Sequence, residues 1–302
     1  MRTEIDTRLD VSIIIVNYNT ADLIKECINS IRKHTSEIRY EIIIVDNGNE
    51  LLNSLESKEV RIISLNNNLG FGKANNEGFK FAKGRNIFFL NPDTILLNNA
   101  VKILSNFLDN HKEAGACGGN LYNSQIQPAY SFKRLFPGVK WEINELLNHI
   151  PQRIAFGSNY CFNQSQSPLT VACLSGACMM VKKEVFEEIG GFGKEFFMYF
   201  EDTDLCKRIS LHGWKIYNVP SAKIQHLESG SFREFDNVKL EQKTQYLEKG
   251  RKIYYSKNHN KIYTRINNII YNIFLTSRII LLRGGIKKDY YKIRKKYFKN
   301  VD

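Results

Sequence analysis

Short apolar runs alternate with helical patterns along the first third of the chain. The apolar runs cover residues 11–16, 40–45, 60–65 and 86–90, and polar residues follow each of them. After the first run, apolar residues recur with helical spacing at Leu23, Cys27, Ile28 and Ile31. Continuous apolar strands that alternate with helices are typical of a parallel sheet covered on both faces. The pattern therefore predicts an α/β fold with a mostly parallel sheet flanked by helices.

The polar ends of these strands predict a shared crevice. In open parallel sheets, ligands bind beyond the carboxyl ends of the strands, so Asp46 and Asp93 should lie together. Residues 120–170 combine aromatic side chains with prolines, and we expect loops over that crevice. Helical spacing returns later, at residues 183–189, 204–211 and from about 237 onward.

Positive charge is concentrated at the end of the chain. Residues 1–235 carry 26 Lys and Arg against 26 Asp and Glu, whereas residues 236–302 carry 17 against 5, so the tail accounts for the net charge of +12. A neutral body with a basic tail disfavours a nucleic-acid reader and favours an anionic partner such as lipid. Residues 265–283 predict an amphipathic helix in the membrane interface. The alternative is a helix packed on the body of the protein or on a second subunit.

Cysteine usage and the N-terminus indicate a cytosolic protein. The six cysteines form no Cys-x-x-Cys pair, so we expect buried free thiols in a reducing compartment. The first ten residues are polar and lack the apolar core of a secretory signal. No apolar run is long enough to span a membrane.

Three carboxylates, Glu201, Asp202 and Asp204, follow an aromatic run at residues 196–200. Like charges repel, and aromatic rings lower the local dielectric, so such a cluster needs a cation, a proton or a helix N-terminus. In the alternative interpretation, Glu201 or Asp202 caps the helix at 204–211 and Asp204 lies in its first turn. The segment can be both a helix start and a catalytic site, because a helix N-terminus keeps a carboxylate ionised and available as a base. The segment predicts a reaction centre.

Two strand ends and one histidine offer further chemistry. Asp93, in the sequence Asn91-Pro-Asp-Thr, is placed to hold a divalent cation that bridges two phosphates, with a plain turn as the alternative. Asp46 is placed to accept hydrogen bonds from a base or a ribose, again with a turn as the alternative. His226 ends a short strand and is either a ligand that complements these acidic motifs or a structural histidine.

A glycine-rich segment opens a helix at residues 70–78. It can offer backbone N–H groups to phosphate, and it imitates a dinucleotide fingerprint. However, Asn75 stands where the third glycine of that fingerprint belongs, and the segment follows the third strand rather than the first. The match is therefore weak.

Taken together, these motifs resemble the inverting family 2 glycosyltransferases with a Rossmann-like GT-A fold, especially rhamnosyltransferase-like members of bacterial O-antigen and capsule assembly. The resemblance covers about residues 11–231. It rests on the order and spacing of Val11–Thr20, Val45–Asn47, Asn68–Asn76, Phe89–Asp93, Gly190–Phe192, Tyr199–Leu205 and His226. The chain departs from the common Asp-x-Asp motif at Asn91, and Asn49 stands where serine is frequent.

The resemblance implies a role for each site residue. It implies a nucleotide-sugar pocket formed by Asn17, Tyr18, Asn19, Asp46, Asn47, Gly70, Lys73, Asn76 and Asn91. Asp93 would bind Mg²⁺ or Mn²⁺ on the diphosphate, with His226 as a second metal or diphosphate ligand. Asp202 would be the general base that deprotonates the acceptor hydroxyl, supported by Glu201 and Asp204. This arrangement suits attack at an anomeric carbon, which needs a base on the acceptor side and a cation beside the leaving diphosphate.

The implied protein is a metal-dependent inverting glycosyltransferase. Its catalytic domain would cover residues 1–236, with a nucleotide-sugar half at 1–119 and an acceptor half at 120–236, and residues 237–302 would form a helical, basic, membrane-associating region. It would transfer a sugar from dTDP-rhamnose or a UDP-sugar to a hydroxyl of a lipid-linked cell-surface polysaccharide intermediate. It would be cytoplasmic, peripheral on the inner face of the bacterial membrane, and would bind no nucleic acid. The rival interpretations are a nicotinamide-dependent oxidoreductase, a sugar-binding protein without catalysis and a nucleic-acid binder.

Overall fold

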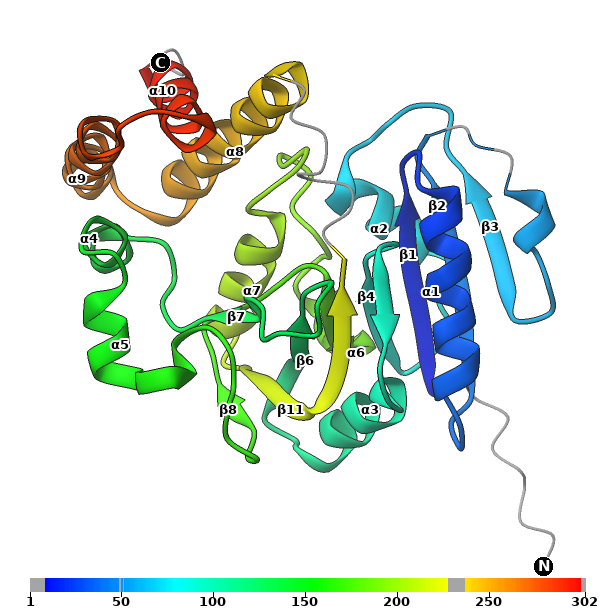
Figure 1. The fold of residues 1–302 in the computed structure, drawn as a ribbon. Helices are drawn as coiled ribbons and strands as arrows, with labels where there is room; N and C mark the ends of the chain where they lie inside the picture. Colours follow the sequence, from blue (N-terminus) through cyan, green and yellow to red (C-terminus); the bar gives the residue numbers. More distant parts are fainter. Residues whose placement is uncertain (1–8, 49, 51, 228–236, 300–302) are drawn as a thin grey trace, which may run out of the picture.

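A large mixed sheet forms the centre of the computed structural model, which describes residues 9–48, 50, 52–227 and 237–299 (Figure 1). The strand order is β3-β2-β1-β4-β10-β6-β11-β5, with β8 beside β11. These strands are β1 (Val11–Asn17), β2 (Tyr40–Asp46), β3 (Val60–Ser64), β4 (Asn86–Leu90), β5 (Thr94–Leu96), β6 (Ala114–Tyr122), β8 (Leu169–Thr170), β10 (Cys178–Lys182) and β11 (Lys215–His226).

The N-terminal strands run parallel and are buried on both faces. Strand β1 pairs in parallel with β2 and β4, and β2 pairs in parallel with β3. Because side chains alternate along a strand, Ile13 and Ile15 pack with α1 (Ala21–His34) and α3 (Ala100–Asn110). The intervening Ile14 and Val16 pack in the layer of α2 (Phe71–Phe79), α6 (Lys183–Glu188) and α7 (Glu201–Leu211). This two-sided burial confirms the predicted α/β fold.

In the second half of the sheet, β10 and β5 run in the opposite direction to the other main strands. Strand β10 runs antiparallel to β4 and β6, while β11 runs parallel to β6 and antiparallel to β5. In that last pairing His226 lies opposite Thr94. The end of β11 is thereby brought beside Asp93, which directly precedes β5.

The prediction that residues 120–170 form loops is wrong for much of the segment. It contains the helices α4 (Val139–Leu146) and α5 (Ile150–Phe156), the 3₁₀ turn η2 (Gly157–Tyr160) and strand β7 (Phe132–Lys133), which pairs with β9 (Cys173–Leu174) just beyond it. Pro151, which we took as a loop signal, lies in the first turn of α5. Proline is favoured there because that position has no intrahelical N–H bond to lose. A further 3₁₀ turn, η1, covers Asn53–Leu55.

Three helices follow near the C-terminus, as the spacing predicts: α8 (Asn237–Asn258), α9 (Lys261–Leu281) and α10 (Ile286–Lys299). They lie beside one another and beside α4 (Figure 1). Arg251 of α8 pairs with Glu142 of α4 at 3.1 Å, and both side chains are buried. Arg294 of α10 pairs with Glu248 of α8 at 2.8 Å. The boundary expected at residue 236 lies outside the described residues.

The structure shows the state of the cysteines and the lengths of the helices. All six cysteines are free thiols, and five are buried, as the spacing predicted. Burial raises the pKa of Cys27 to about 12, so this thiol is unreactive. Among the described residues, no helix combines the length and apolarity needed to span a bilayer.

Candidate active site

The ends of β1 and β2 form one buried polar cluster. Asn17 and Asp46 are 0% and 1% exposed, and Asn17 Nδ2 donates to Asp46 Oδ1 at 3.0 Å. Asn17 Nδ2 also lies 2.8 Å from Glu50 Oε2. Tyr18 beside them is 51% exposed, and Asn19 adopts a left-handed backbone, with φ 56°. The residues predicted to bind the nucleotide thus gather at one edge of the sheet, and their role stays a prediction.

Asn47 fastens the glycine-rich loop to the end of β2. Its Nδ2 donates to Asn68 Oδ1 at 2.8 Å, and its Oδ1 accepts from the backbone N–H of Leu69 at 2.8 Å. The Gly70 N–H donates to Asn68 Oδ1, and the Phe71 N–H donates to the carbonyl of Phe197. The two N–H groups that we expected to face phosphate at this helix start are therefore used within the chain.

Glycine is required at position 70 for a separate, steric reason. Its φ is 84°, and a Cβ there would lie 2.1 Å from the carbonyl oxygen of Phe197. Asn76, on the same helix as the half-buried Lys73, exchanges two 2.9 Å hydrogen bonds with the backbone of Phe192. Both contacts hold the glycine-rich segment against residues 192–197. The nucleotide-sugar roles of Gly70, Lys73 and Asn76 stay predictions.

Asp93 and His226 meet where β5 pairs with β11. His226 Nε2 lies 3.3 Å from Asp93 Oδ1 and 3.5 Å from Asn91 Nδ2, and the Leu227 N–H donates to the Asp93 carbonyl. Asp93 is 8% exposed. In the described part of the chain, no group of three His, Cys, Asp or Glu side chains is arranged to hold a metal. Any cation here would therefore take its remaining ligands from elsewhere, such as a diphosphate or water.

Asp202 lies in the first turn of α7 and is half-buried. Its Oδ2 accepts from the Gly176 N–H at 3.2 Å, and its Oδ1 accepts from the Thr203 N–H at 2.6 Å. Tyr199 and Phe200, directly before the helix, both have left-handed backbones, with φ 68° and 70°. Such a conformation costs bulky residues about 1–3 kcal/mol each, and strain of this kind concentrates at functional sites. The helix start therefore holds Asp202 in a defined orientation.

The two neighbouring carboxylates differ sharply. Burial, and then the charge of Asp202, raises the pKa of Glu201 to about 8, so Glu201 is mainly protonated at neutral pH. Among the residues that the structure describes, none forms a hydrogen bond with its Oε2. Asp204 is fully buried and lies 2.8 Å from Arg208 Nε and 3.0 Å from Lys257 Nζ. Glu201 thus limits the negative charge beside Asp202, and Asp204 anchors the helix.

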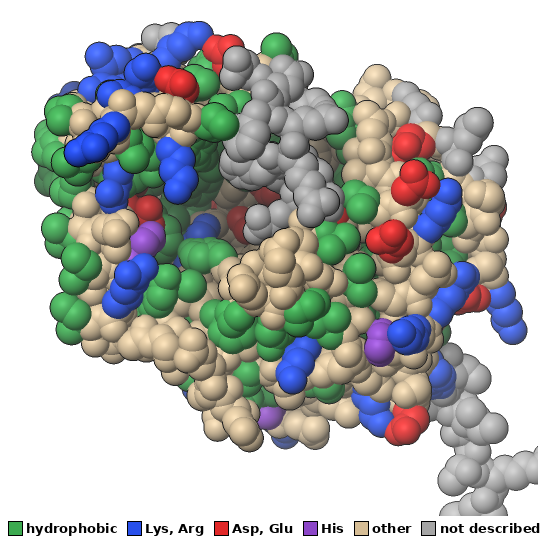
Figure 2. All heavy atoms as spheres, in the orientation of Figure 1, with side chains coloured by type: hydrophobic (Ala, Val, Ile, Leu, Met, Phe, Trp, Pro, Cys, Tyr) green, Lys and Arg blue, Asp and Glu red, His purple; other side chains and the backbone are tan. Residues whose placement is uncertain are grey.

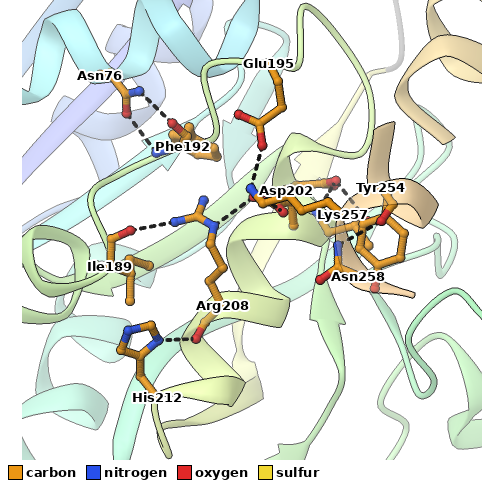
Figure 3. A network of polar contacts seen from close by, with 12 residues as sticks. Asn76, Ile189, Phe192, Glu195, Asp202, Arg208, His212, Tyr254, Lys257 and Asn258 are labelled. Carbon is orange, nitrogen blue, oxygen red and sulfur yellow. Dashed lines mark hydrogen bonds and ion pairs between the residues drawn. The ribbon is translucent and has the colours of Figure 1, made fainter. Parts of the chain in front are cut away.

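The support of α7 comes partly from the C-terminal helices, which sequence reasoning missed. In Figure 3, Lys257 extends from α8 towards Glu195 and the start of α7, while Arg208 reaches back to the carbonyl of Ile189. Lys133 of β7 donates to Thr203 Oγ1 at 2.9 Å. No motif marks Lys133 or Lys257. Glu50, also missed, could have been found as a carboxylate just beyond β2.

A short turn joins the two poles of the site. The Gly176 N–H donates to Asp202 Oδ2 at 3.2 Å, and the next residue, Ala177, accepts at its carbonyl from the Asn91 N–H at 3.1 Å. Consecutive Cα atoms lie about 3.8 Å apart. Asp202 and Asn91, which precedes Asp93 by two residues, therefore bind to adjacent residues of one turn.

Comparisons with known proteins identify the family of the chain. The model of the glycosyl transferase family 2 matches residues 12–190, and a model described as the N-terminal domain of galactosyltransferase matches residues 159–230. Rhamnosyltransferase WbbL of Escherichia coli is 27% identical over 74% of this chain and 86% of its own. The dTDP-rhamnosyl transferase RfbF of Shigella flexneri is 24% identical over 92% of this chain and 90% of its own.

Two further matches extend the picture. The N-acetylglucosaminyl-diphospho-decaprenol L-rhamnosyltransferase of Mycobacterium tuberculosis is 43% identical over 61 residues, 20% of each chain. Among solved structures, GalNAc-T7 with UDP, GalNAc and Mn²⁺ superposes with a TM-score of 0.59 at 15% identity, covering 97% of this chain and 56% of that one. This likeness supports the GT-A fold. The chain belongs to glycosyl transferase family 2 and is a glycosyltransferase.

Proposed function

We propose that the protein transfers a sugar, with inversion, from dTDP-rhamnose or a UDP-sugar to a hydroxyl of a lipid-linked cell-surface polysaccharide intermediate. The observation that carries the proposal is the Gly176–Ala177 turn, which has Asp202 on one side and the strand end leading to Asp93 on the other. The names of the E. coli, S. flexneri and M. tuberculosis relatives support rhamnose, and the M. tuberculosis name also supports a diphospholipid acceptor.

On the acceptor side, Asp202 acts as the general base. Two backbone N–H groups orient its carboxylate, and its partial exposure lets an acceptor hydroxyl approach. The protonated Glu201 adds no second negative charge beside it. As the hydroxyl oxygen bonds to the anomeric carbon and the bond to the diphosphate breaks, the hydroxyl proton passes to Asp202.

On the donor side, Asp93 and His226 would hold Mg²⁺ or Mn²⁺. The 3.3 Å between His226 Nε2 and Asp93 Oδ1 would allow one cation to contact both side chains. The Asp93 carboxylate is the kind of ligand that Mg²⁺ and Mn²⁺ prefer. The bound ion would stabilise the charge of the leaving diphosphate. Asn17, Tyr18, Asn19 and Asp46 would bind the nucleotide.

We place the enzyme on the inner face of the bacterial membrane, with its basic C-terminal region against anionic lipid. The excess of 17 Lys and Arg over 5 Asp and Glu in residues 236–302 supports this placement. A lipid-linked acceptor would make residence at the membrane useful. A homodimer is compatible with the same site.

A panel of nucleotide sugars tests the proposal. The melting temperature of the full chain is measured with each candidate donor, with NAD as a non-sugar comparison, in the presence of Mg²⁺ or Mn²⁺ and after chelation. We expect dTDP-rhamnose or a UDP-sugar to stabilise the protein only with metal, and Asp93→Ala to weaken that stabilisation. Nucleotide release on adding a lipid-diphosphate sugar acceptor then shows turnover. Stabilisation by NAD alone would overturn the proposal.

A further inference from the structure

Helix α9 keeps an apolar stripe in solvent although its opposite side is packed. Tyr271, Phe274 and Leu275 are buried against the neighbouring helices. The exposed stripe consists of Ile262, Ile266, Ile269, Ile273, Ile280 and Leu281, which are 48–73% exposed. The first four recur at intervals of four, three and four residues, which places them on one side of the helix. Packing against the described helices therefore leaves this stripe exposed to solvent.

Helices α4 and α5 expose aliphatic side chains of their own. These are Ile143, Leu147, Ile150 and Ile154, which are 40%, 48%, 54% and 81% exposed. A groove of about 320 Å³ lies between the two helices, and Leu135, Ile143, Pro151 and Phe156 are among the side chains that line it. Apolar exposure on this scale is rare on a free soluble surface and marks an interaction site.

The two sets of side chains belong to neighbouring helices. At one end of α4, the Val139 N–H donates to Tyr263 Oη of α9 at 2.9 Å. At the other end, Arg278 of α9 donates to the carbonyl of Glu145 at 2.9 Å. Figure 2 shows green side chains along the left edge of the molecule, where Figure 1 places α9, α4 and α5. We call this the apolar face.

Charges on the apolar face distinguish a membrane from a second copy of the chain. Helices α5 and α9 contain no acidic residue, and α4 contains two. Of these, Glu142 is buried against Arg251, and Glu145 lies 3.5 Å from His149. The exposed charges are basic and include Lys140, Arg153, Lys261 and Arg265. A twofold dimer through this face would bring like charges together, whereas anionic lipid would neutralise them.

We infer that the apolar face docks on an anionic lipid bilayer and that α4 and α5 of the catalytic body contribute to this contact together with α9. The inference deepens the proposed function, because it relates the bilayer to the acceptor side of the site. Strand β7, which precedes α4, carries Lys133, and Lys133 contacts Thr203 beside Asp202. Docking through α4 and α5 thus fixes the distance between the bilayer and the base.

Vesicle binding by the full chain tests the inference. Vesicles of phosphatidylcholine, with and without phosphatidylglycerol, are pelleted with wild type, with Ile150→Ser/Ile154→Ser on α5 and with Ile269→Ser/Ile273→Ser on α9. Each pair removes exposed aliphatic groups without opening a core, so we expect partitioning to fall about tenfold or more for either pair. Leu211→Ser, at an equally exposed leucine outside the face, should bind like wild type. Phosphatidylglycerol should strengthen binding.

The outcomes separate this inference from the proposed function. Donor-induced stabilisation in the absence of vesicles should be unchanged in both pairs, and it can succeed or fail independently of vesicle binding. Wild-type binding by the α5 pair would overturn the shared face and leave the tail as the sole anchor. A dimer in light scattering that both pairs convert to monomer, without loss of vesicle binding, would assign the face to a second copy and overturn the membrane contact.

Discussion

The proposed donor and acceptor edges of the site are built in opposite ways. At the donor edge, Asn17, Asp46 and Asp93 lie at or just after strand ends, and hydrogen bonds within the sheet region hold them. At the acceptor edge, Asp202 begins a helix whose entry is strained and whose anchor, Asp204, depends on a lysine 53 residues away. The sheet alone therefore positions the donor edge, whereas the acceptor edge also requires the C-terminal helices.

This difference indicates which edge should respond to changes in the C-terminal helices. Helix α8 meets the acceptor edge twice, because a Cβ on Gly250 would lie 2.5 Å from the Tyr199 carbonyl oxygen and Lys257 reaches Asp204. The same helix is tied to α4 through Arg251 and Glu142. Changes in the C-terminal layer should therefore alter transfer while sparing donor binding. The four predictions below test that separation in order of decreasing effect.

Asp202→Asn should have the largest effect. The amide keeps the shape of the side chain but cannot accept the hydroxyl proton, so we expect turnover to fall by about 10²–10⁴-fold. Metal-dependent donor binding, followed by melting temperature, should stay close to wild type. Asp22→Asn, at a 96% exposed side chain, is the matched control. Turnover near the wild-type rate would remove Asp202 as the base and with it the contrast between the edges.

The donor edge could be predicted from the sequence because each of its residues directly follows a recognisable strand. Each apolar run at β1, β2 and β4 ends in the polar residue that meets the crevice, and parallel strands bring such ends together whatever the loops do. His226 could be placed at a strand end, but not beside Thr94, because that pairing follows from the reversal at β10 and β5.

The acceptor edge could be predicted only in part. The three carboxylates predict a helix start. However, the neighbouring sequence does not show that Asp204 pairs with Lys257 or that Glu201 stays protonated. Both depend on burial created by distant segments. The helices of residues 139–156 were missed for a related reason. They are about two turns long, so they depend on packing rather than on propensity. Helix α4 packs on α9, and α5 packs on α4 and η2.

Arg251→Met should have the second largest effect. It leaves the Glu142 carboxylate buried with Tyr255 Oη as its remaining close partner, at 3.0 Å, so we expect the free energy of unfolding to fall by about 3 kcal/mol. Denaturant titration measures this loss. Lys296→Met, which breaks an exposed pair in the same layer, should leave stability nearly unchanged. The separation of the edges predicts that transfer falls more than donor binding, and equal losses would contradict it.

Glu201→Gln should reveal the protonated carboxyl through pH. Burial and Asp202 raise the pKa of Glu201 from 4.5 to about 8, so the folded state keeps a proton that the unfolded state releases between these values. This contribution to stability is complete below about pH 4.5 and is lost as pH rises to about 8. Glutamine mimics the neutral acid and removes the loss. From pH 5 to pH 8, wild type should lose on the order of 3 kcal/mol relative to the variant in denaturant titrations. Parallel curves would mean that Glu201 is ionised throughout.

Lys257→Met should have the smallest effect and the most specific one. Lys257 is about one third exposed, and Asp204 keeps Arg208 at 2.8 Å, so the loss of stability should be about 1 kcal/mol or less. If Lys257 positions α7, the turnover number should fall a few-fold with the donor KM unchanged, because the base shifts while the donor edge does not. Lys257→Arg should restore part of the rate, since a cation again reaches Asp204. Lys252→Met, at an exposed lysine on the same helix, should match wild type in both parameters. A rise in donor KM would show that α8 acts on the whole site, and the two edges would then have to be treated as one cooperative unit.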